Sequence, residues 1–227
     1  MEEFEKKVGV DFKNKDLLKQ AFTHRSYINE NREHKTEHNE RLEFLGDAVL
    51  ELATTEFLFG KYPEKPEGDL TAYRSALVNT QTLAKTASEL GFNEHLLLSK
   101  GESKDTGRAR QYILADTFEA VIGSIYMDRG YDEAKKFIAF SIFPLIDEIV
   151  EKGLWIDSKS MFQEKSQEIV SITPEYRTVS EEGPDHNKQF TIAVHLNGEK
   201  IAEGGGKSKQ EAEQEAARKG IEKKGWM

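Results

Sequence analysis

Apolar residues between positions 15 and 150 recur mostly at intervals of three and four, which is the period of an amphipathic helix. Strand-like alternation is scarce in this part of the chain, and Pro63, Gly91 and Gly130 interrupt the pattern. The pattern predicts an all-helical region with helices at roughly 15–24, 39–60, 68–90, 110–128 and 131–151.

A different pattern begins after this region, with alternation of apolar and polar residues at a period of two. The predicted elements are a helix at 158–171, strands at 175–180, 189–196 and 200–203, and an Ala-rich helix that begins at Ser208. Asn197-Gly198 separates the last two strands and is a strong signal for a tight hairpin. The predicted order is therefore α-β-β-β-α.

The two patterns predict a multi-domain protein. An all-α domain occupies residues 1–151, a linker occupies 152–157, and a small α+β domain occupies 158–227.

Composition narrows the class of protein. With 37% hydrophobic and 32% charged residues the chain is typical of soluble globular proteins, and no apolar run approaches the ~20 residues that cross a bilayer. The acidic start MEEFEKKVGVDF lacks the basic and then apolar order of a secretory signal. We therefore expect a cytoplasmic protein without membrane association. The absence of cysteine excludes disulfides and thiolate metal sites.

A net charge of −9 argues against a nucleic-acid partner, because phosphate affinity normally comes from Lys and Arg. The charge is unevenly distributed: residues 1–157 hold 21 basic and 29 acidic residues, and residues 158–227 hold 11 and 12. A nearly neutral second domain can still bind RNA if its lysines share one face.

Acidic residues gather in two of the predicted helices. Glu40, Glu43 and Asp47 fall within about 60° of arc on one helix, and Asp116 and Glu119 are three residues apart on another. Apolar stripes on the other faces of these helices are predicted to pack in the core: Leu42, Leu45, Val49 and Leu52, and then Leu114, Phe118, Val121 and Ile125.

Spacing alone leaves two interpretations open. The acidic faces are either the solvated sides of two amphipathic helices or the two halves of a metal site. If they converge, the carboxylates repel each other and hold protons unless a divalent cation neutralises them. Oxygen ligands of this kind suit Mg²⁺ or Mn²⁺ and not zinc.

The string NERLEFLGD at 39–47 resembles the signature of the ribonuclease III family. The resemblance extends through DLLKQAFTHRSY, PEGDLTAYRSALVNTQTLA and ILADTFEAVIGSIYMD, and with the C-terminal part it covers nearly the whole chain. It implies an all-α endonuclease domain that hydrolyses double-stranded RNA, including ribosomal and other precursors. It further implies dependence on Mg²⁺, with Mn²⁺ as a substitute, and products with 5′-phosphate and 3′-hydroxyl ends.

The family's carboxylates fall on acidic residues at all six matching positions. These are Glu40, Glu43, Asp47, Glu67, Asp116 and Glu119. The resemblance implies metal ligation by Glu43, Asp47, Asp116 and Glu119, with Asp47 and Glu119 as the first choice. Glu40 and Glu67 are expected to take part in catalysis by supporting the site or placing RNA or water. Gln111 and Tyr112 depart from the family pattern and leave the start of their helix in question.

Phe44 lies outside both the acidic arc and the apolar stripe of its helix. Either another helix of the same domain covers it, or, as the resemblance implies, it enters a pocket of a second subunit in a homodimer. Gly46 lies on the core side, where it permits close crossing of helices. We assign no catalytic histidine: His24 in THRSY matches the family pattern, but each of the six histidines is expected to be structural or solvated.

The α-β-β-β-α part resembles a double-stranded RNA-binding domain, notably in EGPDHNKQF and GGGKSKQEAEQEAA. The resemblance implies contacts with duplex RNA by Gln163, Glu164, Pro184, Asp185, His186, Lys207, Ser208 and Lys209. Lys207, Lys209 and the amides at the start of the last helix would meet phosphates. Gln210 and Glu213 stand where many such domains carry lysine, which predicts weaker phosphate binding.

Two rival functions are an RNA-binding protein without nuclease activity and a metal phosphohydrolase of small phosphate esters. The six intact carboxylates argue against the first. The lack of a histidine metal motif and the presence of an RNA-binding domain argue against the second.

Overall fold

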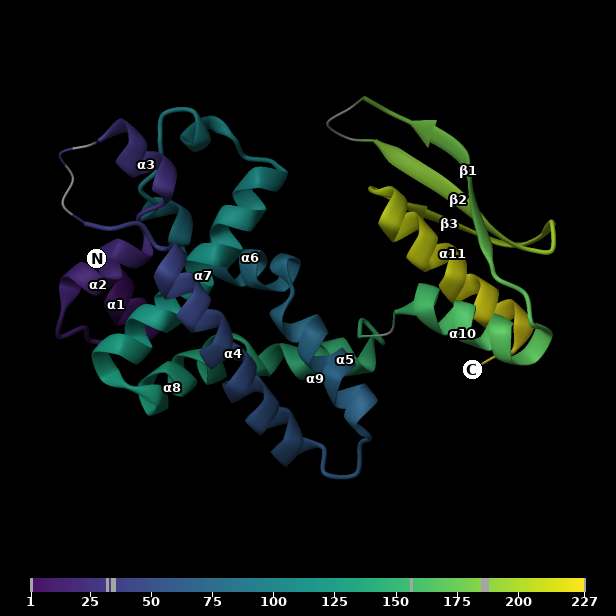
Figure 1. The fold of residues 1–227 in the computed structure, drawn as a ribbon, viewed down its shortest axis with the longest axis horizontal. Coiled ribbons are helices and arrows are strands. Elements are labelled where there is room, and N and C mark those ends of the chain that lie inside the picture. The colour runs from purple at the N-terminus through teal and green to yellow at the C-terminus, as the bar shows by residue number, and fades with distance from the viewer. Residues whose placement is uncertain (1, 32, 34–35, 156, 185–187, 227) are drawn as a thin grey trace. The chain divides into compact units, whose positions relative to one another are not determined.

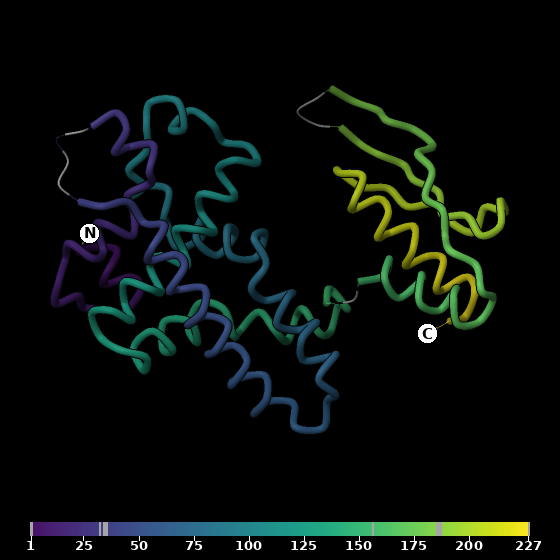
Figure 2. Tube along the Cα trace, in the orientation of Figure 1, coloured from purple at the N-terminus to yellow at the C-terminus, as the bar shows by residue number. Residues whose placement is uncertain are grey.

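The chain forms two compact units in the computed structural model, Met1–Trp155 and Ile156–Met227 (Figures 1 and 2). The structure describes residues 2–31, 33, 36–155, 157–184 and 188–226. Each unit contains its own cluster of buried hydrophobic residues, so each is described by itself.

The first unit is helical, as the sequence pattern predicts, apart from an isolated bridge between Thr23 and Leu97. Its α-helices are α1 (Glu2–Val8), α2 (Lys15–Ala21), α3 (Arg25–Glu30), α4 (Glu40–Lys61), α5 (Glu67–Val78), α6 (Thr80–Glu89), α7 (Arg108–Arg129), α8 (Tyr131–Ser141) and α9 (Ile146–Glu151). Its 3₁₀ helices are η1 (Phe92–Glu94), η2 (Glu102–Lys104) and η3 (Phe143–Leu145).

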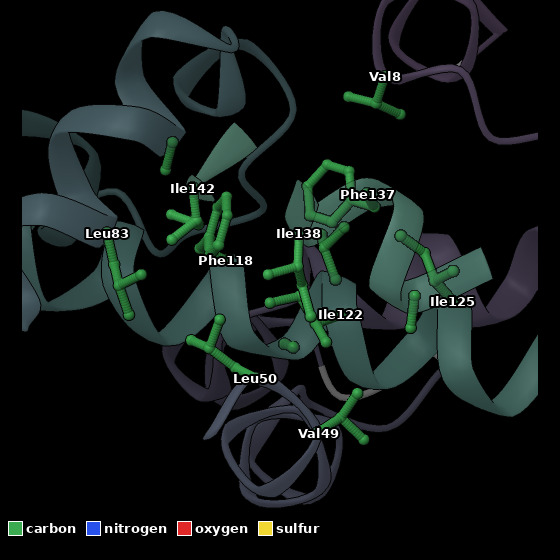
Figure 3. Packing of buried hydrophobic residues seen from close by; sticks show 14 of the residues in the cluster. Val8, Val49, Leu50, Leu83, Phe118, Ile122, Ile125, Phe137, Ile138 and Ile142 are labelled. Carbon is green, nitrogen blue, oxygen red and sulfur yellow. The ribbon is translucent and has the colours of Figure 1, made fainter. Parts of the chain in front are cut away.

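Helix α7 forms the centre of this unit, and α2, α4, α6 and α8 pack around it. Phe118 and Ile122 of α7 lie among Leu50 of α4, Leu83 of α6 and Ile138 of α8, and all five side chains are buried (Figure 3). Burying each side chain of this size contributes about 1.5–3 kcal/mol. The core therefore holds α4 and α7 in a fixed relation to each other.

Two long helices expected from the sequence are each divided. The stretch 68–90 is broken at Asn79, whose extended backbone (φ −73°, ψ 159°) ends α5 and whose side chain accepts the Thr82 amide to begin α6. The stretch 131–151 is broken at η3, where Pro144 cannot donate a helical hydrogen bond.

The second unit has the predicted α-β-β-β-α order. Its elements are α10 (Ser158–Val170), β1 (Glu175–Glu182), β2 (Gln189–Leu196), β3 (Glu199–Gly206) and α11 (Lys209–Lys224). The strands form an antiparallel sheet in the order β1-β2-β3 (Figure 1). Helix α11 packs on β2 and β3, and α10 packs on α11.

The predicted hairpin at Asn197-Gly198 is confirmed. Both residues have positive φ, 48° and 81°, which is the conformation of a tight turn between antiparallel strands. The turn fixes a register in which Leu196 faces Glu199. Val194 of β2 is thereby placed in the core of this unit, where it packs with Phe162.

Helices α4 and α7 each run for 22 residues. Even so, no helix in the described part of the chain is apolar enough over its length to cross a membrane.

Candidate active site and RNA-binding surface

Helices α4 and α7 approach so closely that their backbones touch at two glycines. A Cβ atom on Gly46 would lie 1.8 Å from the carbonyl oxygen of Glu119, and one on Gly123 would lie 2.1 Å from that of Leu42. Real Cβ atoms do not approach backbone this closely, so only glycine fits at either position. The close crossing expected of Gly46 is confirmed, and it brings the acidic faces of the two helices together.

Three carboxylates meet beside this crossing. Oxygen atoms of Glu43 on α4 and of Asp116 and Glu119 on α7 all lie within 4.8 Å of one another. All three residues are half-buried. The acidic faces therefore converge at these residues, and the interpretation of them as two separate solvated faces is wrong.

Burial and mutual repulsion raise the pKa values of the three carboxyl groups in this cluster. Burial, followed by the charges of Asp47, Asp116 and Glu43, raises the pKa of Glu119 to about 8. Burial, followed by the charges of Asp116, Glu40 and Asp47, raises the pKa of Glu43 to about 7. The pKa of Asp116 is also raised, first by burial and then by Glu40. These upward shifts have the direction expected for buried carboxylates that repel one another.

Glu40 lies close enough to raise the pKa values of Glu43 and Asp116, and it has two basic residues, Arg25 and His38, as neighbours of its own. Arg25 Nη1 of α3 donates to Glu40 Oε1 at 3.3 Å, and His38 Nδ1 lies 3.8 Å from Glu40 Oε2. Sequence reasoning missed Arg25. Arg25 follows His24 in the string THRSY, which resembles the family, and this could have drawn attention to it. Its contact with Glu40, however, depends on the tertiary fold.

Besides Glu40, two more of the six predicted carboxylates, Asp47 and Glu67, lie outside the group of three. Asp47 is exposed on α4 and acts on Glu43 and Glu119 through its charge. Glu67 is exposed at the first residue of α5, where its carboxylate accepts a hydrogen bond from Thr71 Oγ1 at 2.9 Å. Among the described contacts, none joins Glu67 to the other five acids.

Phe44 is 81% exposed, so no helix of its own unit covers the ring. Leu52 was expected in the core but is 53% exposed, whereas Leu42 and Val49 of the same predicted stripe are buried. Counting 100° per residue, Leu52 and Phe59 lie within about 80° of Phe44 around α4. Phe59 is also exposed, so these three apolar residues form a stripe along one side of α4.

His24 has a structural role, one of the two roles expected of the histidines. Its ring Nδ1 accepts the Ser26 amide and so caps the first turn of α3. Burial lowers the pKa of this histidine, which favours the neutral ring that such a cap needs.

The predicted RNA-contacting residues of the second unit lie on its surface where they are described. Gln163 and Glu164 are exposed on α10, and Pro184 is exposed after β1. Asp185 and His186 lie outside the described residues. Lys207 and Lys209 are exposed on either side of Ser208.

The start of α11 is already hydrogen-bonded within the unit. Ser208 Oγ accepts the Glu211 amide at 3.1 Å, and Glu211 Oε2 accepts the Lys207 amide at 2.7 Å. These two amides therefore have protein acceptors at the place where the sequence suggested phosphate. Glu213, which stands where many such domains have lysine, pairs with Lys159 Nζ at 2.5 Å.

Comparisons with known proteins identify both units. The profile of the family described as Ribonuclease-III-like matches residues 14–146, and that of the double-stranded RNA binding motif matches residues 158–224. Ribonuclease 3 of Geobacillus thermodenitrificans is 49% identical over 221 residues, which cover 97% of this chain and 89% of that protein. Ribonuclease 3 of Listeria monocytogenes is 45% identical over 225 residues, or 98% and 96% of the two chains.

A solved structure agrees with these matches. The nuclease domain of ribonuclease III from Campylobacter jejuni superposes with a TM-score of 0.56 at 41% identity, covering 63% of this chain and 98% of that domain. Its description refers to flexibility in the region involved in dimer formation. Together with the converging carboxylates of α4 and α7 and the α-β-β-β-α unit, the matches confirm the resemblance seen in the sequence, and the chain belongs to the ribonuclease III family.

Proposed function

We propose that this protein is a double-strand-specific endoribonuclease that requires Mg²⁺, for which Mn²⁺ can substitute. It hydrolyses phosphodiester bonds of RNA precursors, ribosomal ones among them, and leaves 5′-phosphate and 3′-hydroxyl ends. The observation that carries the proposal is the group formed by Glu43, Asp116 and Glu119 at the α4–α7 crossing. The RNA-binding motif at 158–224 supports duplex RNA as the substrate.

The donor set fits a hard divalent cation. The three clustered ligands are carboxylate oxygens, and the chain has no cysteine to favour a softer metal. The raised pKa values of Glu43 and Glu119 reflect burial first and then the negative charge of neighbouring carboxylates, which a divalent cation would neutralise. When bound, Mg²⁺ supplies an activated water nucleophile and neutralises charge on the leaving oxygen.

The proposed role of each residue follows from its position. Glu43, Asp116 and Glu119 hold the cation together with Asp47, and α4 and α7 fix their spacing. Glu40, held by Arg25, and Glu67 take part in catalysis from outside this group by supporting it and placing RNA or water. Hydrolysis adds water to phosphorus and breaks the bond to the 3′ oxygen, which takes up a proton to become the 3′-hydroxyl.

The domain arrangement and the location of the protein are parts of the same proposal. Residues 1–151 are the nuclease domain, 152–157 the linker and 158–227 the RNA-binding domain, in a cytoplasmic protein. In the proposed linker, the Trp155 ring packs on Tyr73 of the first unit with centroids 4.9 Å apart, and Asp157 caps α10. Gln163, Glu164, Pro184, Asp185, His186, Lys207, Ser208 and Lys209 are the proposed RNA contacts.

The direct test compares one duplex RNA with its separated strands, with Mg²⁺ or with a chelator. We expect cleavage of the duplex alone, only with Mg²⁺, and products that carry 5′-phosphates. Duplex binding without cleavage at any Mg²⁺ concentration would favour the RNA-binding rival. Hydrolysis of a small phosphate ester in place of RNA would favour the phosphohydrolase rival.

The proposed enzyme is a homodimer through the nuclease domain, because one acidic cluster cuts one strand at a time. Phe44 is the proposed anchor, and the exposed stripe that it forms with Leu52 and Phe59 is the surface to be covered. A two-fold interface uses each residue twice, so a substitution removes two contacts.

Replacing Phe44 with Asp is expected to raise the dimer dissociation constant about a hundredfold or more, since each buried Phe contributes ~1.5–3 kcal/mol. Sedimentation velocity measures this directly. Phe140→Asp is a matched control, because Phe140 is 58% exposed on α8 and should leave the association unchanged. An undisturbed dimer in the Phe44 variant would show that the anchor is misplaced.

A further inference from the structure

Lys209 is one of the proposed phosphate contacts, yet its ammonium already has an anionic partner within its own unit. Lys209 Nζ lies 2.6 Å from Glu181 Oε1 on β1 and 5.7 Å from the centre of the Phe190 ring on β2. Glu181 and Phe190 face each other in the β1–β2 register, and Phe190 faces Gly206 in the β2–β3 register. Glu181, Phe190 and Gly206 thus form one row across the sheet. The side chain of Lys209, the first residue of α11, lies against Glu181 and Phe190 in that row.

This pairing matters because, apart from Lys207, other positive charge is scarce at the start of α11. Positions 210 and 213 carry Gln and Glu, and Glu213 is itself paired with Lys159. Lys209 is therefore a main source of attraction for phosphate at this point. While its ammonium is paired with Glu181, the two side chains have a net charge of zero.

The pair is short but accessible to solvent. The side chain of Lys209 is 57% exposed and that of Glu181 is 36% exposed. The hydrogen bond from Lys209 lowers the pKa of Glu181, so the carboxylate is ionised at neutral pH. Exposed ion pairs of this kind are weak, and a phosphate group can exchange with the carboxylate.

We propose that Glu181 limits the affinity for duplex RNA, because a phosphate must take the ammonium of Lys209 from it. The inference rests on the proposed function, since it concerns the same RNA-binding surface. RNA gains one phosphate contact but leaves the Glu181 carboxylate unpaired near its backbone. The net gain in binding free energy at this contact is therefore smaller than the gain from a lysine that has no partner in the free protein.

The test measures duplex RNA binding to the full-length protein by fluorescence anisotropy, with a chelator present to prevent cleavage. Glu181→Gln is expected to tighten binding about twofold to fivefold at low salt, the range that exposed ion pairs allow. The dependence of log K on log salt should steepen by up to about one unit, because one further positive charge becomes available to phosphate.

Glu182→Gln is the matched control. It removes the same charge from the next residue of β1, which points to the opposite face of the sheet. It should leave binding nearly unchanged. In a Lys209→Gln background, Glu181→Gln should no longer tighten binding beyond the effect of Glu182→Gln.

Equal effects of the Glu181 and Glu182 substitutions would overturn the inference, because they would reflect net charge alone. A gain that persists without Lys209 would also overturn it and would point to Lys188, which lies near enough to lower the pKa of Glu181. Weaker binding by Glu181→Gln would mean that the carboxylate positions Lys209 and does not compete for it. Absence of duplex binding by the unaltered protein would instead contradict the proposed function.

Discussion

Replacing Glu119 with Gln is expected to slow cleavage of duplex RNA by more than about a hundredfold while leaving RNA binding in chelator nearly unchanged. Loss of residues that only orient metal ligands commonly costs 10–100-fold, and Glu119 is proposed as a direct ligand. The change keeps the shape of the side chain and removes its charge. Single-turnover cleavage at several Mg²⁺ concentrations measures the loss.

The same substitution has a second expected effect, on stability without metal. The pKa of Glu119 is raised in the folded protein to about 8, so ionising it costs more in the folded than in the unfolded state. Stability is therefore lost as pH rises from the unfolded pKa, near 4.5, to about 8. Glu119→Gln should remove this loss and raise the melting temperature in chelator at pH 8.

Glu89→Gln is the control for both measurements. Glu89 is exposed at the end of α6, 4.0 Å from Lys85, and removing its charge should change neither cleavage nor the pH dependence appreciably. Cleavage by the Glu119 variant within a few-fold of the unaltered protein at physiological Mg²⁺ would exclude Glu119 as an essential ligand.

Adding one methyl group at Gly46 should be as damaging as removing a ligand. The new Cβ would lie 1.8 Å from the carbonyl oxygen of Glu119, so α4 must shift away from α7. Overpacking typically costs about 1–3 kcal/mol, and a clash with rigid backbone belongs at the upper end or beyond it. The shift also separates Glu43 from Asp116 and Glu119. We therefore expect Gly46→Ala to lose both unfolding free energy and cleavage activity.

Gly60→Ala is the matched control, because it makes the same change in the same helix where nothing lies within 4 Å of the added Cβ. There alanine should stabilise the protein by about 0.5–1 kcal/mol through its higher helix propensity. Urea unfolding measures the free energy of unfolding of both variants. It thereby separates the effect of helix propensity from the effect of the clash at the helix crossing. Equal stability of the two variants would show that α4 and α7 do not cross at Gly46 as closely as described.

Local signals in the sequence predict most of the fold. Helical periodicity predicts the helical unit, the Asn197-Gly198 pair predicts the hairpin, and Gly46 predicts the close crossing. Asn79 is a typical capping residue, and its side chain accepts the Thr82 amide where the helix is broken. The break was not predicted because the apolar periodicity continues on both sides of it. The exposure of Leu52 was not predictable in this way, because its position on α4 satisfies the core pattern equally well.

The candidate site was predictable in part. Spacing places acids on one face of each helix, but only the fold shows which acids meet. Glu43, Asp116 and Glu119 do so, whereas Glu67 has no described contact with them. Interactions between residues far apart in the sequence, such as Arg25 with Glu40 and Glu181 with Lys209, left no periodic signal. They depend on how the elements pack.

Separate hydrophobic cores in the two units have a consequence for catalytic turnover. Once the second unit holds a duplex, the first unit meets that duplex intramolecularly, at an effective concentration on the order of millimolar for a short tether. The second unit then does not need high intrinsic affinity to deliver substrate. A modest affinity, such as the pairing of Lys209 with Glu181 would produce, lets cleaved fragments dissociate quickly and frees the enzyme for the next duplex.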